Sequence, residues 1–85
     1  MEIVEGSIVR SIAGRDMGDL FIVLAREGDY VYLANGELRK VDRPKKKKLK
    51  HLQGTSSVSE FIQNKLKAAG KVTNAEVRKA LSEFN

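Results

Sequence analysis

The chain has 85 residues and a formal net charge of +5, from 16 Lys and Arg residues against 11 Asp and Glu. Apolar residues make up 41% of it and charged residues 32%, a balance typical of a soluble folded domain. It has no cysteine, which excludes disulfide scaffolds, thiol nucleophiles and cysteine-based zinc sites and fits a reducing compartment. The longest apolar run, LFIVLA at residues 20–25, is far below the roughly 18 residues of a membrane helix, and MEIVEG is no secretory signal. We therefore expect a cytoplasmic protein that has no membrane partner.

The positive charge is concentrated in one stretch of the chain. Residues 1–38 contain three basic and seven acidic side chains, whereas residues 39–50 contain eight basic side chains and one acid. The segment RPKKKKLKHLQ at residues 43–53 holds six of these basic residues. A dense cationic run beside a near-neutral body favours a polyanionic partner.

Short runs rich in Val, Ile, Leu, Phe and Tyr predict that the first half of the chain is β. Four strands are expected, at residues 7–13, 19–25, 29–34 and 37–41, with the lysine run as a final extended strand. Because LFIVLA is continuously apolar, its strand should be covered on both faces. Four or five short strands within roughly 50 residues favour a small barrel, which hides its edges by closing.

The turn residues predict a hairpin in this β region, and the alternation of side chains along one strand predicts which of them face the core. Asn35-Gly36 predicts a type I′ hairpin between the third and fourth strands, because both residues tolerate positive φ. In DYVYLA at residues 29–34, Val31 and Leu33 should face the core while Tyr30 and Tyr32 face the opposite side.

After a predicted break at residues 54–57, GTSS, the apolar spacing becomes helical. The first helix has an expected capping box of Ser57 and Glu60 and should end at Gly70; its apolar stripe is Val58, Phe61, Ile62, Leu66 and Ala69. The second helix begins at Thr73, which forms a capping box with Glu76; its stripe is Val77, Ala80, Leu81 and Phe84. We therefore divide the chain into residues 1–53 and a helical hairpin at 54–85.

Two helices of this length do not bury their stripes stably alone. They must pack on the barrel, on a second copy in a homodimer, or on a partner protein. The sequence leaves these three arrangements open.

The β region resembles a KOW unit, the short β motif of SH3-like barrels in ribosomal proteins and transcription elongation factors. The matching positions lie between Gly6 and about Val41, with a continuation to Leu52; they are Gly6, Val9, Ser11, AGRDMG at 13–18, Asn35-Gly36 and PKKKKLKHL at 44–52. Within that class the chain is most similar to the ribosomal-protein-like KOW RNA-binding proteins. The resemblance implies a mainly β fold, an SH3-like barrel followed by a two-helix segment. It also implies binding to RNA, above all ribosomal RNA, with ribosomal proteins as neighbours.

The basic run has three interpretations: a solvated linker, a localisation or membrane-surface tag, or a wall that contacts RNA. We favour the wall, because Leu49 and Leu52 would pin the segment to the body. The run also begins at Arg39-Lys40, inside the predicted fourth strand. Such anchoring would present the charges in a fixed direction.

The predicted RNA-binding residues fall into three chemical types. Arginines pair bidentately with phosphates or stack on bases, and the candidates are Arg15, Arg39 and Arg43. Lysines attract phosphates as point charges; these are Lys40, Lys45, Lys46, Lys47, Lys48 and Lys50. Tyr30 and Tyr32 either stack on unpaired bases or cover the base of the C-terminal helices. Asp16 is expected to orient Arg15 or to cap its turn.

No catalytic, cofactor or metal site is predicted. His51 is the only histidine and has no evident acid–base partner, and GRDMG lacks the Gly-Lys-Ser/Thr ending of a P-loop. The rival to RNA binding is a protein-interaction module, which would dock onto a ribosomal or transcription-machinery protein. Such docking would depend on the apolar stripes, for example on Phe61 or Leu81.

Overall fold

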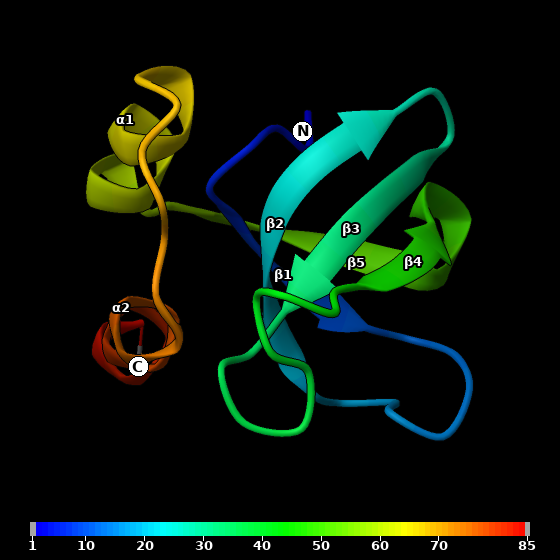
Figure 1. Ribbon diagram of the computed structural model, residues 1–85. Coiled ribbons are helices and arrows are strands. Elements are labelled where there is room, and N and C mark those ends of the chain that lie inside the picture. Colours follow the sequence, from blue (N-terminus) through cyan, green and yellow to red (C-terminus); the bar gives the residue numbers. More distant parts are fainter. Residues whose placement is uncertain (1, 85) are drawn as a thin grey trace.

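The structure, a computed structural model, describes residues 2–84 and consists of a five-stranded antiparallel sheet and two α-helices (Figure 1). The strands are β1 (Ser7–Ser11), β2 (Leu20–Glu27), β3 (Tyr30–Ala34), β4 (Lys45–Lys48) and β5 (Leu52–Val58). The helices are α1 (Glu60–Lys67) and α2 (Asn74–Glu83), and a 3-10 turn, η1 (Leu49–His51), joins β4 to β5. The prediction of a mainly β chain with two C-terminal helices is confirmed.

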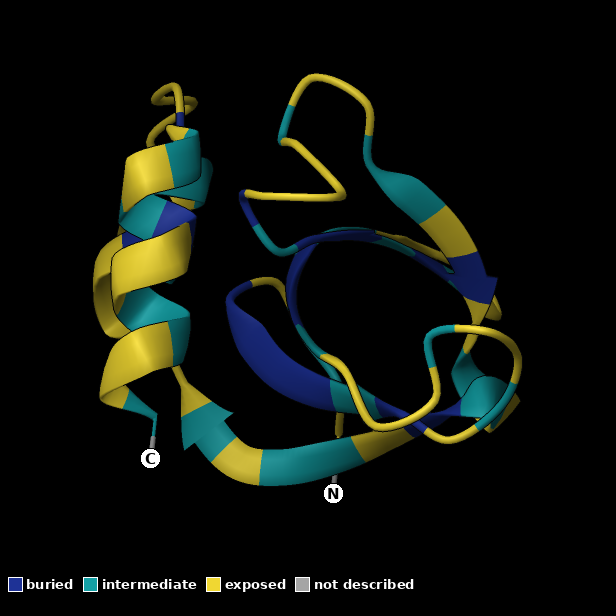
Figure 2. Ribbon diagram, turned by 90° about the horizontal axis from the view of Figure 1, so that it is seen from below, coloured by how far each residue is buried: buried dark blue, intermediate teal, exposed yellow. Residues whose placement is uncertain are grey.

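The sheet is curled, and its two edges are consecutive strands. The strand order is β4-β3-β2-β1-β5, so β4 and β5 lie at opposite edges although only the three residues of η1 separate them. Register irregularities between Ser7 and Val9 and between Val23 and Ala25 bend the sheet further. In Figure 2 the strands curl around on themselves, and both helices lie together on one outer side. The two edge strands are not paired, so the sheet is not closed.

Each face of the sheet has its own apolar core. The concave face is filled by Val9, Phe21, Val23, Val31, Leu33 and Leu52. Between the convex face and the helices lies a second core, formed by Ile8, Ile22, Ile62, Val72 and Val77. Alternation along β1 and β2 supplies both cores, which confirms that LFIVLA is covered on both sides. The helices therefore pack on the sheet, the first of the three arrangements that the sequence left open.

Each helix lies close to a glycine with positive φ just outside a strand, Gly6 before β1 and Gly36 after β3. Gly6 has φ 87°, and a Cβ there would lie 2.8 Å from Cβ of Gln63 in α1. Gly36 has φ 79°, and its Cβ would lie 2.5 Å from the carbonyl oxygen of Asn74 in α2. Any larger residue would be strained in its backbone and would push a helix away from the sheet.

The predicted fourth strand at residues 37–41 and the predicted Asn35-Gly36 hairpin are wrong. Residues 35–44 form a loop between β3 and β4, and among them only Gly36 has positive φ. The Asn35 side chain explains the difference, because its Oδ1 accepts from the backbone N–H of Glu37 at 3.0 Å and of Arg39 at 2.9 Å. Such side-chain bonds compete with a strand ladder for the backbone donors.

The predicted break at residues 54–57 is also wrong, because β5 continues through it. This stretch pairs with β1, and the Thr55 hydroxyl donates to the Ile8 carbonyl at 2.6 Å. The first helix consequently begins later than expected. Its N-cap is Ser59, whose hydroxyl accepts from the Ile62 N–H, instead of the predicted Ser57. At the start of α2 the predicted capping box of Thr73 and Glu76 is confirmed.

The apolar stripe of α1 is narrower than predicted. Ile62 is fully buried and Leu66 packs on the same core, whereas Phe61 is 61% exposed. Residues four apart share a helix face, so the face that contains Ile62 and Leu66 turns Phe61 to the side. The predicted placement of Phe61 in the buried stripe is therefore wrong.

The C-terminus of α1 has Schellman geometry with an alanine at the left-handed position. Ala69 has φ 57°, its N–H bonds to the Leu66 carbonyl at 3.1 Å, and the Gly70 N–H bonds to the Lys65 carbonyl at 2.7 Å. Glycine usually occupies the left-handed position because it lacks the Cβ that strains this conformation. The predicted helix stop at Gly70 thus lies one residue beyond the strained position.

Replacing Ala69 by Gly should raise the free energy of unfolding by up to about 1.5 kcal/mol. The substitution removes left-handed strain of roughly 1–2 kcal/mol against an entropic cost of roughly 0.5–1 kcal/mol. Gly70→Ala is the matched control and should destabilise, since a Cβ there would lie 2.8 Å from Lys65 Cγ. Urea denaturation measures both variants. A less stable Ala69→Gly variant would contradict this account of the helix end.

Candidate nucleic-acid interface

The four lysines of β4 are divided between the two faces of the sheet. β4 is an edge strand that pairs only with β3, and Lys47 lies opposite the core residue Val31. Because side chains alternate along a strand, Lys45 and Lys47 point to the concave side while Lys46 and Lys48 point outward. Lys47 is 8% exposed, whereas Lys46 and Lys48 are exposed. The basic run is therefore not a single cationic surface.

The two inward lysines share one carboxylate, that of Asp16. Lys47 Nζ donates to Asp16 Oδ1 at 2.6 Å, to Ser11 Oγ at 2.6 Å and to the Ala13 carbonyl at 2.9 Å. Lys45 Nζ donates to Asp16 Oδ2 at 2.8 Å. This cluster, called here the Asp16 network, fastens β4 to the 12–19 loop between β1 and β2. Asp16 therefore binds the two lysines, whereas the sequence suggested that it orients Arg15 or caps a turn.

The Asp16 network also sets the protonation of its carboxylate. Burial alone raises the pKa of Asp16, but the hydrogen bonds from Lys45, Lys47 and Ser11 outweigh it. The pKa of Asp16 is consequently held well below its ordinary value. Asp16 is ionised at neutral pH. Its negative charge is paired with Lys45 and Lys47, so these two lysines should not be counted as free surface charge.

The outward lysines lie beside the two tyrosines of β3. Lys46 Nζ is 4.7 Å from the centre of the Tyr30 ring and 6.0 Å from that of Tyr32, and Lys48 Nζ is 5.8 Å from Tyr30. These distances are typical of cation–π contacts. Neither tyrosine belongs to the core under the helices among the described residues. We call Tyr30, Tyr32, Lys46 and Lys48 the outer strip.

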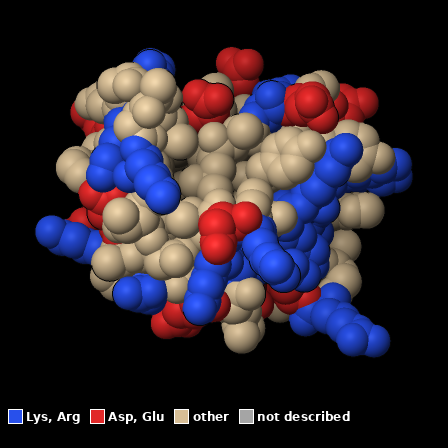
Figure 3. Space-filling model, in the orientation of Figure 1, with Lys and Arg blue, Asp and Glu red and all other residues tan. Residues whose placement is uncertain are grey.

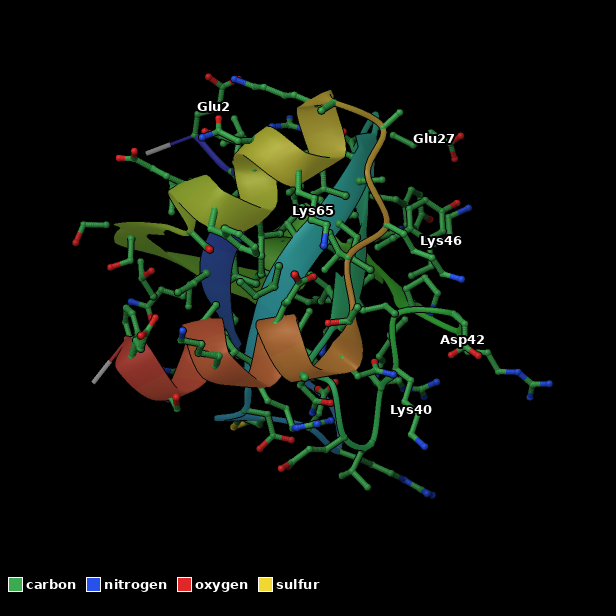
Figure 4. All side chains as sticks on the ribbon, turned by 60° about the vertical axis from the view of Figure 1, so that its left-hand side comes forward. Glu2, Glu27, Lys40, Asp42, Lys46 and Lys65 are labelled. Atoms are coloured by element: carbon green, nitrogen blue, oxygen red, sulfur yellow. The ribbon has the colours of Figure 1, made fainter. Side chains whose placement is uncertain are left out.

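The outer strip continues into neighbouring basic groups. Beyond Lys48, a hollow of about 570 Å³ is lined by Asp29, Tyr30, Lys48, Leu49 and Lys50. Figure 3 shows Lys and Arg side chains gathered over the β3–β4 part of this face. Figure 4 shows Lys46 and Lys40 projecting from the same side of the molecule.

The 35–44 loop carries Arg39, Lys40 and Arg43, all exposed. Arg39 and Lys40 are not in a strand, so the predicted strand anchoring of these two residues is wrong. Helix α2 anchors the loop instead. Asn74 Oδ1 accepts from the Val41 N–H at 2.8 Å, and Arg78 donates to the Gly36 carbonyl at 2.7 Å. No local sequence signal pointed to these contacts, because they link positions more than 30 residues apart.

Arg15 and Arg39, distant in the sequence, come together at one end of the sheet. Both line a hollow between the 12–19 loop and the 35–44 loop, with a volume of about 340 Å³. The predicted residues thus form three groups. Tyr30, Tyr32, Lys46 and Lys48 form the outer strip, with Lys50 in the hollow beside it; Arg15, Arg39, Lys40 and Arg43 lie on the loops; Lys45 and Lys47 belong to the Asp16 network.

Within residues 2–84, no three His, Asp or Glu side chains are grouped so that they could hold a metal ion. His51 lies half-buried in η1. Among the described helices, none has the length and apolar character needed to cross a membrane.

Comparison of the chain with models of known protein families found no match, and no curated protein matches it. Function is therefore inferred from the geometry of the outer strip, the loops and the Asp16 network.

Stability should fall in acid because of Asp16. The folded pKa is depressed, so the unfolded chain takes up the proton first as the pH falls. The stabilisation is complete at neutral pH and is lost progressively below about pH 5. Asp16→Asn should lower the free energy of unfolding by about 2 kcal/mol at pH 7, because Lys47 then stays buried without its counter-charge.

Urea denaturation of wild type and Asp16→Asn between pH 7 and pH 3 measures this effect. The stability difference between the two proteins should shrink as the pH falls. Asp19→Asn is the matched control, since Asp19 is an exposed acid of the same loop. A difference that stays constant across this pH range would show that Asp16 is not the titrating group.

Proposed function

We propose that this chain is an RNA-binding protein and that the outer strip is the centre of its binding surface. One observation carries the proposal: exposed lysines and half-buried tyrosine rings share one sheet face, with Lys46 Nζ 4.7 Å from the Tyr30 ring centre. Lysines attract the phosphate backbone, and aromatic rings offer stacking surfaces for unpaired bases. This combination suits structured RNA that has loops or bulges, because its unpaired bases are accessible.

The preference for RNA over DNA depends on the resemblance to KOW proteins, since phosphate attraction does not distinguish the two. That resemblance also supports an SH3-like barrel as the fold family and ribosomal RNA as the target. The curled five-stranded sheet with a 3-10 turn before its last strand is compatible with such a barrel. Under this proposal the protein acts in the cytoplasm beside ribosomal proteins, without cofactor or catalysis.

The Asp16 network narrows the set of cations to which we assign phosphate contacts. Lys45 and Lys47 are held by Asp16, so we assign phosphate contacts to Lys46, Lys48 and Lys50 and to the basic residues of the two loops. Because the inward lysines stabilise the fold, their removal would confuse loss of folding with loss of binding. Lys46 and Lys48 lie outside the Asp16 network, so their substitution tests binding without this loss of folding.

The double substitution Lys46→Gln with Lys48→Gln should weaken binding to a ribosomal RNA fragment and flatten its salt dependence. Loss of two phosphate contacts should reduce the slope of log K against log salt by roughly 1.4 on single strands and 1.8 on a duplex. Fluorescence anisotropy across a salt series measures both quantities. The control Lys67→Gln with Lys71→Gln removes the same charge from exposed positions near the end of α1. Equal slopes for the two double variants would refute the assignment.

A protein-interaction module is the second candidate, and the exposure of Phe61 favours it. Phe61 is 61% exposed and lines a hollow of about 380 Å³ with Glu76, Lys79, Ala80 and Glu83 of α2. A large exposed aromatic beside a concave surface is typical of a docking site. The partner would be a ribosomal or transcription-machinery protein. A homodimer through the helices would use the same side chain.

Ribosome pelleting at low and high salt separates the two candidates. Docking predicts association that survives high salt and is lost in Phe61→Ser, whereas RNA binding predicts loss at high salt and in the outer-lysine variant. Because Phe61 is exposed, its substitution should change stability by less than about 0.5 kcal/mol. Ultracentrifugation of Phe61→Ser and wild type tests the homodimer. High-salt association that Phe61→Ser leaves unchanged would count against docking through this face.

A further inference from the structure

The hollow between the 12–19 loop and the 35–44 loop has two fixed walls. The Asp16 network holds the first loop against β4, and Asn74 and Arg78 of α2 hold the second. The volume is about 340 Å³. This is near the lower end of small-molecule sites, which measure on the order of 300–1,000 Å³, so the hollow has room for a small group and not for a duplex.

The hollow has unpaired positive charge. Neither the Arg15 nor the Arg39 guanidinium forms an ion pair within residues 2–84, and both residues are exposed. The carboxylate of Asp16, which also lines the hollow, is engaged by Lys45 and Lys47. Two free arginines that line one hollow are suited to a phosphate, because each guanidinium presents a planar fork of donors.

The hollow also offers groups that suit a nucleobase. Leu38, 87% exposed, provides an apolar surface at the rim, and the buried Phe21 lies at its wall. Asn35 Oδ1 accepts two backbone N–H bonds, which fixes the orientation of the amide and leaves its NH₂ group as a donor. Asp19 adds an exposed carboxylate as an acceptor. Donor and acceptor groups beside an apolar surface match the polar edge and flat face of a base.

We propose that this hollow holds one unpaired nucleotide of a bound RNA. Its phosphate lies on Arg15 and Arg39, and its base lies against Leu38 within reach of Asn35 and Asp19. The inference rests on the proposed RNA binding and deepens it. The outer strip supplies general attraction, and the hollow selects RNA in which a nucleotide is free of pairing. A bulged nucleotide that enters the hollow should tighten binding about tenfold over the paired duplex.

The test uses three RNA duplexes of one sequence: fully paired, with a single-nucleotide bulge, and with an abasic residue at the bulge. Fluorescence anisotropy at fixed salt measures each affinity. Wild type should bind the bulged duplex about tenfold more tightly than the paired one, and the abasic site should remove most of this gain. Leu38→Ser should lose the preference for the bulge while keeping the affinity for the paired duplex. This substitution is exposed and uncharged, so it changes neither folding nor phosphate attraction.

Two further variants make the test specific. Arg15→Gln with Arg39→Gln should remove the bulge preference and also weaken all three duplexes, because it removes two phosphate contacts. Met17→Ser is the matched control for Leu38→Ser, since Met17 is an apolar residue of the 12–19 loop that is 65% exposed. It should behave as wild type.

The outcomes separate this inference from the proposed function. A Leu38→Ser protein that keeps the bulge preference, or a wild type that binds all three duplexes equally, would overturn the nucleotide site and leave RNA binding through the outer strip intact. A wild type that binds none of the three would overturn both proposals. If Leu38→Ser loses the preference for the bulged duplex and Met17→Ser keeps it, the result would support the nucleotide site.

Discussion

The ion pair between Lys47 and Asp16 is the interaction on which the arrangement of this surface depends. Lys47 occupies a strand position that faces the apolar core, where an ammonium group is tolerated only when its hydrogens are bonded and its charge is balanced. Asp16, Ser11 and Ala13 meet that need. An inward charge on an edge strand also discourages edge-to-edge association. Since the network fixes the direction of Lys47, alternation fixes the opposite direction of Lys46 and Lys48.

Helix α2 has the corresponding role for the second loop, so the two-helix segment is part of the surface architecture. Its contacts reach the 35–44 loop at Gly36 and Val41. Gly36 permits the close approach, as Gly6 does for α1, because neither has a Cβ in the space that the helix occupies. Damage to the helix–sheet core would therefore disturb the loop arginines as well as stability, although no helix residue lines the hollow beside them.

Local patterns in the sequence predicted the elements well and their long-range contacts poorly. Alternation placed Val31 and Leu33 in the core, and the Thr73–Glu76 capping box marked the start of α2. The hairpin predicted at Asn35-Gly36 was wrong because an Asn side chain stabilises a wide loop as readily as a tight turn. Strand alternation alone divides KKKK between two faces. The acid that the inward pair needs is some 30 residues away, and nothing in the sequence singles out Asp16 from ten other acids.

The division of the lysine run changes what its charge means for binding. If all five lysines at 45–50 contacted phosphates, the slope of log K against log salt would be roughly −3.5 on single strands. Only Lys46, Lys48 and Lys50 lie outside the Asp16 network, and three contacts give a slope of roughly −2.1. A steeper slope requires the four cations of the two loops to contact phosphates as well. Under the proposed RNA binding, the slope would report how far a bound RNA extends from the outer strip toward the hollow at the end of the sheet. The two inward lysines, of which only Lys47 is buried, contribute to folding, and through folding they hold the exposed charges in the geometry on which the proposed RNA binding depends.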